Sequence, residues 1–426
     1  MATEAVSPTR KLEGSPVIPG DKSISHRALI FGALSKGQTE VTHLLESGDV
    51  NSTASCLRQL GIEITSKGGK TLVKGCGGYR FKQPAEILDC GNSGTTMRLL
   101  MGVLAGQNLN VSLTGDSSLV KRPMKRVSEP LSLMGAEFQL TENNFAPLTI
   151  RGKKLKGIDY NLKIASAQIK TAIILAALNA EGITRISGEI HSRDHTERML
   201  ASFGVNISSD EKQVVINGGQ NLSGQKVRVP GDPSTAAFWL GAASLVADSK
   251  IEMEHISLNP SRTGFAQALQ KMGAKIKTEV TVKDPEPMGT ISVSRGELMG
   301  IHIHPEDVPS LIDEIPLLAI LATQAQGQTV VEGAEELRVK ESDRIEAVAQ
   351  NLRAMGAQIE VRKDGFVING PQKLKGAVIE SFHDHRIAMA FSIAGLVAQG
   401  PTEIKNAECV GISYPAFFTT LRELSR

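Results

Sequence analysis

The sequence predicts an α/β protein made of two pseudo-symmetric domains, each built from three repeat units. Three observations lead to this fold class. A short mark consisting of Leu, two variable residues, an apolar residue and Gly recurs along the chain. An apolar helix that opens with small or polar residues recurs between the copies of that mark. Finally, Val-Pro-Gly-Asp at 229–232 echoes Val-Ile-Pro-Gly-Asp at 17–21.

The glycine mark is typical of a helix end followed by a strand, because glycine readily adopts the left-handed backbone conformation just past a helix. Its five full copies are LRQLGI, LSLMGA, LASFGV, LQKMGA and LRAMGA, with glycines at Gly61, Gly135, Gly204, Gly273 and Gly356. A truncated sixth copy, LRELS, places Ser425 in the glycine position. Alternating stretches around Gly, Asn or Asp follow, and they predict hairpins.

The apolar helices keep the same interval. Their starts are separated by 71, 73, 67, 80 and 72 residues, and they lie near Lys22, Ser93, Ser166, Pro233, Asp313 and His385. Each helix is followed by a Gly, Asp or Asn break and a short strand. Since repeats of fixed period indicate one repeated structural unit, the chain is predicted to contain six copies of helix–strand–helix–strand–strand.

The echo of the Pro-Gly-Asp sequence predicts where the domains divide. Gly20 and Gly231 are 211 residues apart, almost half the chain. We therefore expect one domain at 20–230 and a second made of 1–19 plus 231–426, with a hinge near Gly20 and Pro230. Pro-Gly sequences are typical of turns and suit such a hinge.

Composition excludes several classes of function. Lys+Arg 47 against Asp+Glu 45 gives a net charge of +2, which argues against a nucleic-acid-binding surface. The 16 aromatic residues (12 Phe, 1 Trp, 3 Tyr) are too few to suggest base-stacking platforms. Four widely spaced cysteines predict neither a disulfide framework nor a zinc site. With no secretory signal and no apolar stretch of membrane-spanning length, we expect a cytoplasmic protein without membrane contact.

Polar residues gather at the starts of the six apolar helices. A helix N-terminus offers unpaired N–H groups and a positive dipole end, so it favours phosphate or carboxylate. The Ser, Asp and Asn residues there can equally be ordinary N-caps. Cations at a helix start oppose the dipole and require an anion, which favours a binding site. These positions include Lys22, Ser23, Arg27, Asn92, Gly94, Arg98, Ser166, Gln168, Asp313, Glu314, Asp384, His385 and Arg386.

Cationic loops precede the second helices of three units, at 121–124, 192–195 and 338–344. In the last of them, Lys340 and Arg344 are one helical turn apart with Glu341 beside them. A solvated i,i+4 charge network is the alternative interpretation. The repetition of such loops favours a common anionic site. His302 and His304 could face one metal ion, but no third ligand is evident, which favours exposed strand histidines.

Five segments resemble the 5-enolpyruvylshikimate-3-phosphate (EPSP) synthase family over essentially the whole chain. They are GDKSISHR at 20–27, GNSGTTMR at 91–98, KRPM at 121–124, RVKESDR at 338–344 and DHRIAM at 384–389. The resemblance implies two domains of three βαβαββ units, an inside-out α/β barrel of the enolpyruvyl transferase type. It also implies transfer of the carboxyvinyl group of phosphoenolpyruvate to the 5-hydroxyl of shikimate 3-phosphate, in the shikimate pathway to chorismate and aromatic amino acids.

The resemblance also assigns site residues. Asp313 and Glu341 are implied as acid and base, and Lys22 as a bridge to both substrates. The implied shikimate 3-phosphate ligands are Lys22, Ser23, Arg27, Ser166, Gln168, Arg193, Asp313 and Lys340. The implied phosphoenolpyruvate ligands are Lys22, Gly94, Arg122, Gln168, Arg344, His385 and Arg386. Neither a metal nor an organic cofactor is implied, the domains are expected to close on the substrates, and the protein is expected to be monomeric.

The chain departs from the better-known members in two places. Ser-Ala-Gln-Ile-Lys at 166–170, together with Arg193, resembles the divergent second class of the family, and Gly411 stands where many members have Lys. Gly94 is retained, which predicts competitive inhibition by the herbicide glyphosate.

Two alternative functions remain. The related transferase acting on UDP-N-acetylglucosamine typically has a Cys in the loop that here reads SSLVKRPM, and a non-catalytic phosphometabolite binder would gain nothing from Asp313 and Glu341.

Overall fold

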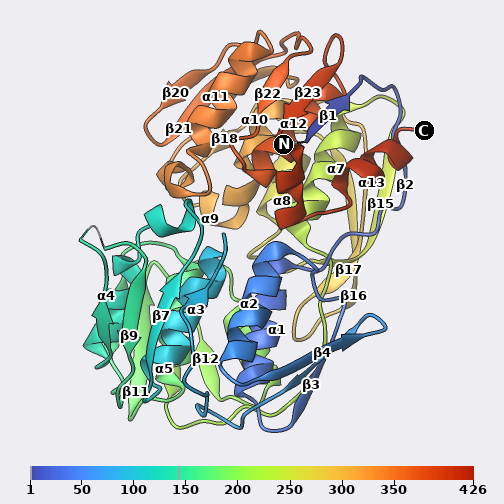
Figure 1. The fold of residues 1–426 in the computed structure, drawn as a ribbon. Coiled ribbons are helices and arrows are strands. Elements are labelled where there is room, and N and C mark those ends of the chain that lie inside the picture. The colour runs from blue at the N-terminus through green and yellow to red at the C-terminus, as the bar shows by residue number, and fades with distance from the viewer. Residues whose placement is uncertain (1, 143) are drawn as a thin grey trace. The chain divides into compact units, whose positions relative to one another are not determined.

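The computed structural model describes residues 2–142 and 144–426, which divide into two compact units (Figure 1). Unit N is Gly20–Val229, and unit C is Pro230–Arg426 together with the N-terminal residues up to Pro19. The chain changes unit at the two Pro-Gly sequences. Gly20 is required there, because a Cβ on it would lie 2.1 Å from the carbonyl oxygen of His43.

The second and third repeats of unit N each form a complete βαβαββ module with its own four-stranded sheet. In the second, β6 runs parallel to β7, and β9 lies between β7 and β8, antiparallel to both. Its elements are β6 (Leu88–Asp89), α3 (Gly94–Ala105), β7 (Asn110–Thr114), α4 (Lys125–Leu133), β8 (Glu137–Gln139) and β9 (Leu148–Arg151). The third repeats this order with β10 (Asp159–Leu162), α5 (Ala167–Ala177), β11 (Ile183–Gly188), α6 (His195–Ser202), β12 (Ile207–Ser209) and β13 (Gln213–Asn217).

The first repeat of unit N takes its first strand from the C-terminal end of the unit. It contains α1 (Lys22–Leu34), β3 (Gln38–Thr42), α2 (Gly48–Gln59), β4 (Glu63–Lys67) and β5 (Lys70–Lys74). The strand that should precede α1 is β14 (Lys226–Arg228), which pairs in parallel with β3. The unit is therefore closed by its own last strand.

Unit C follows the same plan with strands borrowed from the N-terminus. Its first repeat has β2 (Glu13–Gly14), α7 (Pro233–Leu245), β15 (Lys250–Ser257), α8 (Gly264–Lys271), β16 (Lys275–Val282) and β17 (Met288–Ser294). Its second has β18 (His302–Ile303), α9 (Val308–Leu311), α10 (Ile315–Ala322), β19 (Gly327–Val331), α11 (Arg344–Ala354), β20 (Glu360–Arg362) and β21 (Gly365–Gly370). Its third has β22 (Val378–Glu380), α12 (His385–Gly395), β23 (Thr402–Lys405) and α13 (Phe417–Leu424), and β1 (Thr3–Val6) pairs antiparallel with β23.

In each unit the first helices of the repeats lie inside and the sheets outside (Figure 1). The helices α1, α3 and α5 are buried almost all round, which explains why their sequences are apolar without a polar face. Gly102 on α3 is needed for this packing, since a Cβ there would lie 2.3 Å from the carbonyl oxygen of Ala172 on α5. The predicted α/β fold class, with helices enclosed by sheets, is confirmed.

The predicted glycine mark is also confirmed in its physical role. All five glycines have φ between 82° and 119°, immediately after the second helix of a repeat: Gly61, Gly135, Gly204, Gly273 and Gly356. Only a residue without a Cβ adopts this conformation without strain. The truncated sixth copy ends differently, because Ser425 caps α13 with φ −90°.

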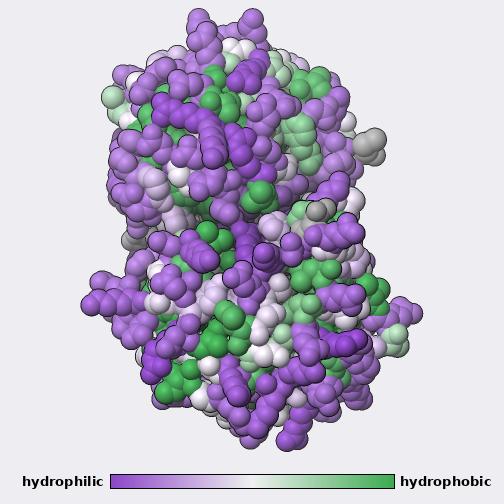
Figure 2. Space-filling view, turned by 90° about the vertical axis from the view of Figure 1, so that its left-hand side faces the viewer, coloured by the Kyte–Doolittle hydropathy of each residue, from purple (hydrophilic) through white to green (hydrophobic). Residues whose placement is uncertain are grey.

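Hydrophilic side chains cover most of the face shown in Figure 2, and the hydrophobic patches on it are small and separate. Among the described residues, none of the helices is long and apolar enough to cross a membrane.

Candidate active site

In unit N, the starts of α1, α3 and α5 are tied together by polar side chains. Arg27, buried on α1, donates from Nε to Thr196 Oγ1 (2.8 Å) and from Nη2 to Thr171 Oγ1 (2.8 Å). Gln168, at the start of α5, donates to Thr95 Oγ1 on α3 (2.9 Å). These hydrogen bonds bring the three positive helix ends together. We call the polar residues at these helix starts, with those that contact them from α2, α6 and the α3–α4 loop, cluster N.

Two buried guanidinium groups surround Gly94, the first residue of α3. Arg122 donates from Nη2 to Asn92 Oδ1 (3.0 Å) and to Ser118 Oγ (3.3 Å). Arg98 hydrogen-bonds to Gln168 Oε1. A Cβ on Gly94 would lie 3.4 Å from Arg122 Nη1, so the glycine leaves the guanidinium room. Two cations and a helix N-terminus around one small residue form a strongly positive position suited to an anion.

The remaining predicted residues of cluster N lie at the same helix starts. Lys22 opens α1 and donates to Asp49 Oδ2 on α2 (3.1 Å), a carboxylate that is itself mostly buried. Ser166 caps α5, accepting from Ile169 N (3.5 Å). Ser23 is the second residue of α1, and Arg193 is half-buried in the loop before α6.

In unit C, a single buried guanidinium holds three carboxylates. Arg344 is 1% exposed and opens α11. It donates from Nε to Asp384 Oδ2 (2.8 Å), from Nη1 to Asp313 Oδ1 (3.1 Å) and from Nη2 to Glu341 Oε2 (2.6 Å). Burial alone would lower the pKa of Arg344, but the carboxylates of Asp384, Glu341 and Asp313 raise it. Arg344 therefore stays charged in the interior.

Arg386, on the first turn of α12, is the second buried cation of unit C. Its Nη2 lies 3.5 Å from Asp313 Oδ2, and its Nη1 lies 3.7 Å from Glu314 Oε1. His385 opens the same helix and is buried, and Asp384 caps it by accepting from Arg386 N (2.9 Å). Lys340 ends the 3₁₀ turn at 335–339 beside Glu341 and is half-buried. We call the polar residues at the starts of α7, α10, α11 and α12 cluster C.

The electrostatics of the two clusters differ. In cluster C, four carboxylates (Asp313, Glu314, Glu341, Asp384) surround two guanidinium groups. Cations at helix starts require an anion, and in cluster C the protein itself supplies it. Such pairs can exchange their internal partner for a phosphate or carboxylate, because the geometry of both interactions is alike.

Several contacts were missed at the sequence level. Thr171 and Thr196 position Arg27, and Asp49 pairs with Lys22, yet no local pattern marks them. Arg98 and Asp384 are among the helix-start positions that the sequence indicates, although the resemblance assigns neither of them to a substrate. Their partners come from other repeats, so their roles depend on tertiary packing.

Other candidate centres lie apart from these clusters. His302 and His304 stack with ring centroids 3.9 Å apart, and His302 Nε2 lies 3.0 Å from Glu332 Oε2. Within residues 2–142 and 144–426, no three His, Cys, Asp or Glu side chains could share a metal ion. All four cysteines are free thiols.

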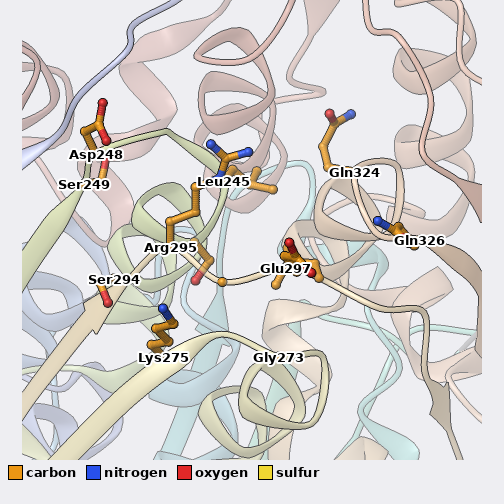
Figure 3. A pocket seen from close by; sticks show the side chains of 13 residues that line it. Leu245, Asp248, Ser249, Gly273, Lys275, Ser294, Arg295, Glu297, Gln324 and Gln326 are labelled. Carbon is orange, nitrogen blue, oxygen red and sulfur yellow. The ribbon is translucent and has the colours of Figure 1, made fainter.

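A cavity of about 1080 Å³ lies in unit C at the C-terminal end of α7 (Figure 3). Lys275, Arg295, Glu297 and Gln326 contribute side chains to its wall, and all four are exposed. None of the predicted site residues lines it, and the carboxylates and guanidinium groups of cluster C lie at the opposite, N-terminal ends of their helices.

Comparison with known proteins agrees with the resemblance. Residues 6–421 match the sequence profile of the family described as EPSP synthase (3-phosphoshikimate 1-carboxyvinyltransferase). A 3-phosphoshikimate 1-carboxyvinyltransferase of Bacillus thuringiensis is 47% identical over 417 residues, covering 97% of each chain. One from Sulfurihydrogenibium is 47% identical over 429 residues, covering 99% of this chain and all of that one. A solved EPSP synthase structure from Acinetobacter baumannii superimposes with a TM-score of 0.88 at 42% identity, covering 99% and 98% of the two chains.

Proposed function

The chain belongs to the EPSP synthase family, and on that premise we propose that clusters N and C carry out the carboxyvinyl transfer of this family. The protein is a transferase, a 3-phosphoshikimate 1-carboxyvinyltransferase. It moves the carboxyvinyl group of phosphoenolpyruvate to the 5-hydroxyl of shikimate 3-phosphate and releases phosphate.

The observation that carries the proposal is the pair of carboxylates bound to one buried guanidinium. Asp313 and Glu341 both accept hydrogen bonds from Arg344, at 3.1 and 2.6 Å. In a protein that only bound anions, carboxylates at the cationic site would weaken the affinity for those anions. An enzyme that adds a hydroxyl across a double bond needs an acid and a base beside its anion clamps.

The anionic groups of the substrates match the cations of the two clusters. We assign shikimate 3-phosphate to Lys22, Ser23, Arg27, Ser166, Gln168, Arg193, Asp313 and Lys340. We assign phosphoenolpyruvate to Lys22, Gly94, Arg122, Gln168, Arg344, His385 and Arg386. Arginine suits both substrates because its planar donors bind phosphate and carboxylate in a bidentate manner.

The reaction then proceeds in two balanced steps. In the addition step, a base removes the proton of the 5-hydroxyl, its oxygen bonds to C2 of phosphoenolpyruvate, and an acid protonates C3. In the elimination step, a proton leaves the new methyl group, the double bond re-forms, and the bond from C2 to the phosphate oxygen breaks. Asp313 and Glu341 serve as the acid and base, and the guanidinium groups balance the charge of the tetrahedral intermediate.

Binding of phosphoenolpyruvate also changes the partners of the carboxylates. In the structure, Asp313 and Glu341 are engaged by Arg344, and Arg386 adds to the hold on Asp313. When the phosphate and carboxylate of the substrate bind to these guanidinium groups, Asp313 and Glu341 interact with them less. The carboxylates of Asp313 and Glu341 then become more basic, because less positive charge stabilises their ionised form. The substrate would thus help to activate its own acid and base.

A phosphate-release assay tests the proposed function. The purified protein should release phosphate when given both shikimate 3-phosphate and phosphoenolpyruvate, and not with either alone. UDP-N-acetylglucosamine in place of shikimate 3-phosphate serves as the competing acceptor and should give no release. Release with that acceptor, or release in the absence of any acceptor, would contradict the proposal. We further expect the protein to be a monomer that works in the cytoplasm without nucleic acid.

A further inference from the structure

Glu314 is a buried carboxylate that the proposed reaction does not use. It ends the 3₁₀ turn at 312–314, directly after Asp313, and caps α10. Its side chain is 4% exposed, and Oε1 lies 3.7 Å from Arg386 Nη1. That oxygen accepts no hydrogen bond within the described residues, so the guanidinium of Arg386 is its charge partner. A buried carboxylate needs such a partner to offset its lost hydration.

A second buried guanidinium, that of Arg262, also acts electrostatically on Glu314. Arg262, buried in the loop before α8, donates from Nη2 to Ser234 Oγ (2.8 Å) and to Asp232 Oδ1 (2.9 Å). A hydroxyl has one proton, and since Ser234 Oγ accepts from Arg262, that proton is available to a neighbouring acceptor. Burial raises the pKa of Glu314 above its ordinary value, and the nearby carboxylate of Asp313 adds to the rise, whereas Arg386, Arg262 and the Ser234 hydroxyl oppose it.

Arg262 stands where the other repeats carry their substrate cations. It precedes the second helix of its repeat, as Arg122 precedes α4 and Arg193 precedes α6. In this repeat the cation is neutralised inside the protein by Asp232, at 2.9 Å. The start of α7 therefore holds an internal ion pair, and the same guanidinium also donates to Ser234 Oγ.

We propose that Glu314 is a positioning residue for Arg386, holding its guanidinium where phosphoenolpyruvate is to bind, and that Arg262 and Ser234 hold Glu314 in turn. The inference rests on the proposed function, since it takes Arg386 as a phosphoenolpyruvate ligand. The side-chain order is Arg262, Ser234, Glu314, Arg386, with contacts of 2.8 Å at one end and 3.7 Å at the other.

The test is Glu314→Gln. Glutamine keeps the shape, but the Ser234 proton claims its single oxygen. The NH₂ group of the glutamine then faces Arg386 Nη1. Because both groups are hydrogen-bond donors, they cannot bond to each other, and the guanidinium is displaced. We expect the KM for phosphoenolpyruvate to rise about tenfold, while the Kd for shikimate 3-phosphate stays within about twofold, because one charge-assisted contact is lost at a single ligand.

Two further variants make the result decisive. Ser234→Ala removes the link to Arg262 and should raise the same KM by a smaller factor, about threefold. Glu286→Gln is the matched control. Glu286 is a buried carboxylate of the same unit that accepts from Asn259 Nδ2 (3.0 Å), so its variant should lower the melting temperature without changing that KM.

The outcomes separate the two proposals. If the wild-type protein releases no phosphate from its two substrates, the proposed function fails. If the wild type is active but Glu314→Gln keeps its KM for phosphoenolpyruvate within about twofold, Glu314 has only a structural role and the inference is overturned. Should Glu314→Gln not fold, an unchanged KM in Ser234→Ala would overturn it.

Discussion

Asp313 is held by both buried guanidinium groups of cluster C. It lies within 3.1 Å of Arg344 and 3.5 Å of Arg386, so two guanidinium groups share one carboxylate. In the proposed assignment, most of the cations that bind shikimate 3-phosphate belong to cluster N. The loss of Asp313 should therefore affect chemistry far more than binding of that substrate.

We predict that Asp313→Ala reduces kcat by about a hundredfold to ten-thousandfold, because an acid–base group contributes about 10²–10⁴ to the rate. Binding of shikimate 3-phosphate, measured by calorimetry, should change by less than about threefold, since its phosphate clamps remain. An equal loss of binding and rate would recast Asp313 as a residue that positions the substrate.

Gly94 is the second residue whose size should decide a measurable property. A Cβ there would lie 3.4 Å from Arg122 Nη1 and 3.6 Å from Arg98 Nη1, close enough to press on the guanidinium groups without a backbone clash. Gly94→Ala should therefore fold normally, raise the KM for phosphoenolpyruvate severalfold and weaken competitive inhibition by glyphosate. Inhibition constants for both proteins check this, and equal constants would show that the methyl group does not reach the inhibitor.

At the scale of elements, the contact between α3 and α5 depends on one glycine. The Cβ of an alanine at 102 would lie 2.3 Å from Ala172 O and 2.7 Å from Ala172 Cα, and both atoms belong to the backbone. Gly102→Ala should reduce the free energy of unfolding by about 1–3 kcal/mol or more, since neither helix can yield without moving the other.

Urea unfolding measures this effect, and Gly48→Ala provides the control. Gly48 opens α2, and a Cβ on it would meet nothing within 4 Å. That variant should be neutral or slightly stabilising, because alanine restricts the unfolded chain. Equal stabilities for the two variants would mean that the packing accommodates a Cβ at position 102 without a clash.

The repeat pattern predicts the positions of the helices better than the pairing of the strands in the sheets. Gly61 and its four counterparts end their helices as the sequence indicated, and the six buried helices start where predicted. The partner of β3 was not predictable, because β14 is a three-residue strand, Lys226–Arg228, with no alternation to mark it. The same holds for β1, which replaces a whole hairpin in the last repeat.

In the site, too, the sequence predicts where side chains lie along the chain but not which side chains they contact. Local sequence reveals that Lys22 or Arg386 begins a helix, and the resemblance supplies a role for it. Local sequence does not reveal that Asp49 on the next helix forms an ion pair with Lys22. Nor does it reveal that Asp384 and Glu341 both bind the guanidinium of Arg344. Those pairings depend on how the repeats pack, which no single segment encodes.

For the whole molecule, stability should depend on pH through a buried histidine. His26 on α1 is 0% exposed, and its Nδ1 lies 2.7 Å from Thr53 Oγ1. Burial, together with the positive charges of Lys22 and Arg27, holds the pKa of His26 well below its ordinary value of 6.5. The unfolded chain therefore binds a proton near pH 6.5 that the folded protein does not bind.

The sign follows from proton linkage. Stability from His26 is fully present above pH 6.5 and is lost as the pH falls below it toward the lower folded pKa. The slope approaches about 1.4 kcal/mol per pH unit for one proton. Urea unfolding of the wild type and His26→Gln between about pH 8 and pH 5.5 should show a shallower slope in the variant. Parallel slopes would assign the pH dependence to other groups.

The pairing of β1 with β23 has a consequence for synthesis on the ribosome. Val6 pairs with Thr402, so the first strand of unit C emerges about four hundred residues before its partner exists. At about 5–20 residues per second, it waits on the order of 20–80 s. Unit N, contained between Gly20 and Val229, can complete its sheets during that interval. The N-terminal strands are thus unpaired edges in the nascent chain, and delays in translation after Val229 prolong their exposure to chaperones and to other nascent chains.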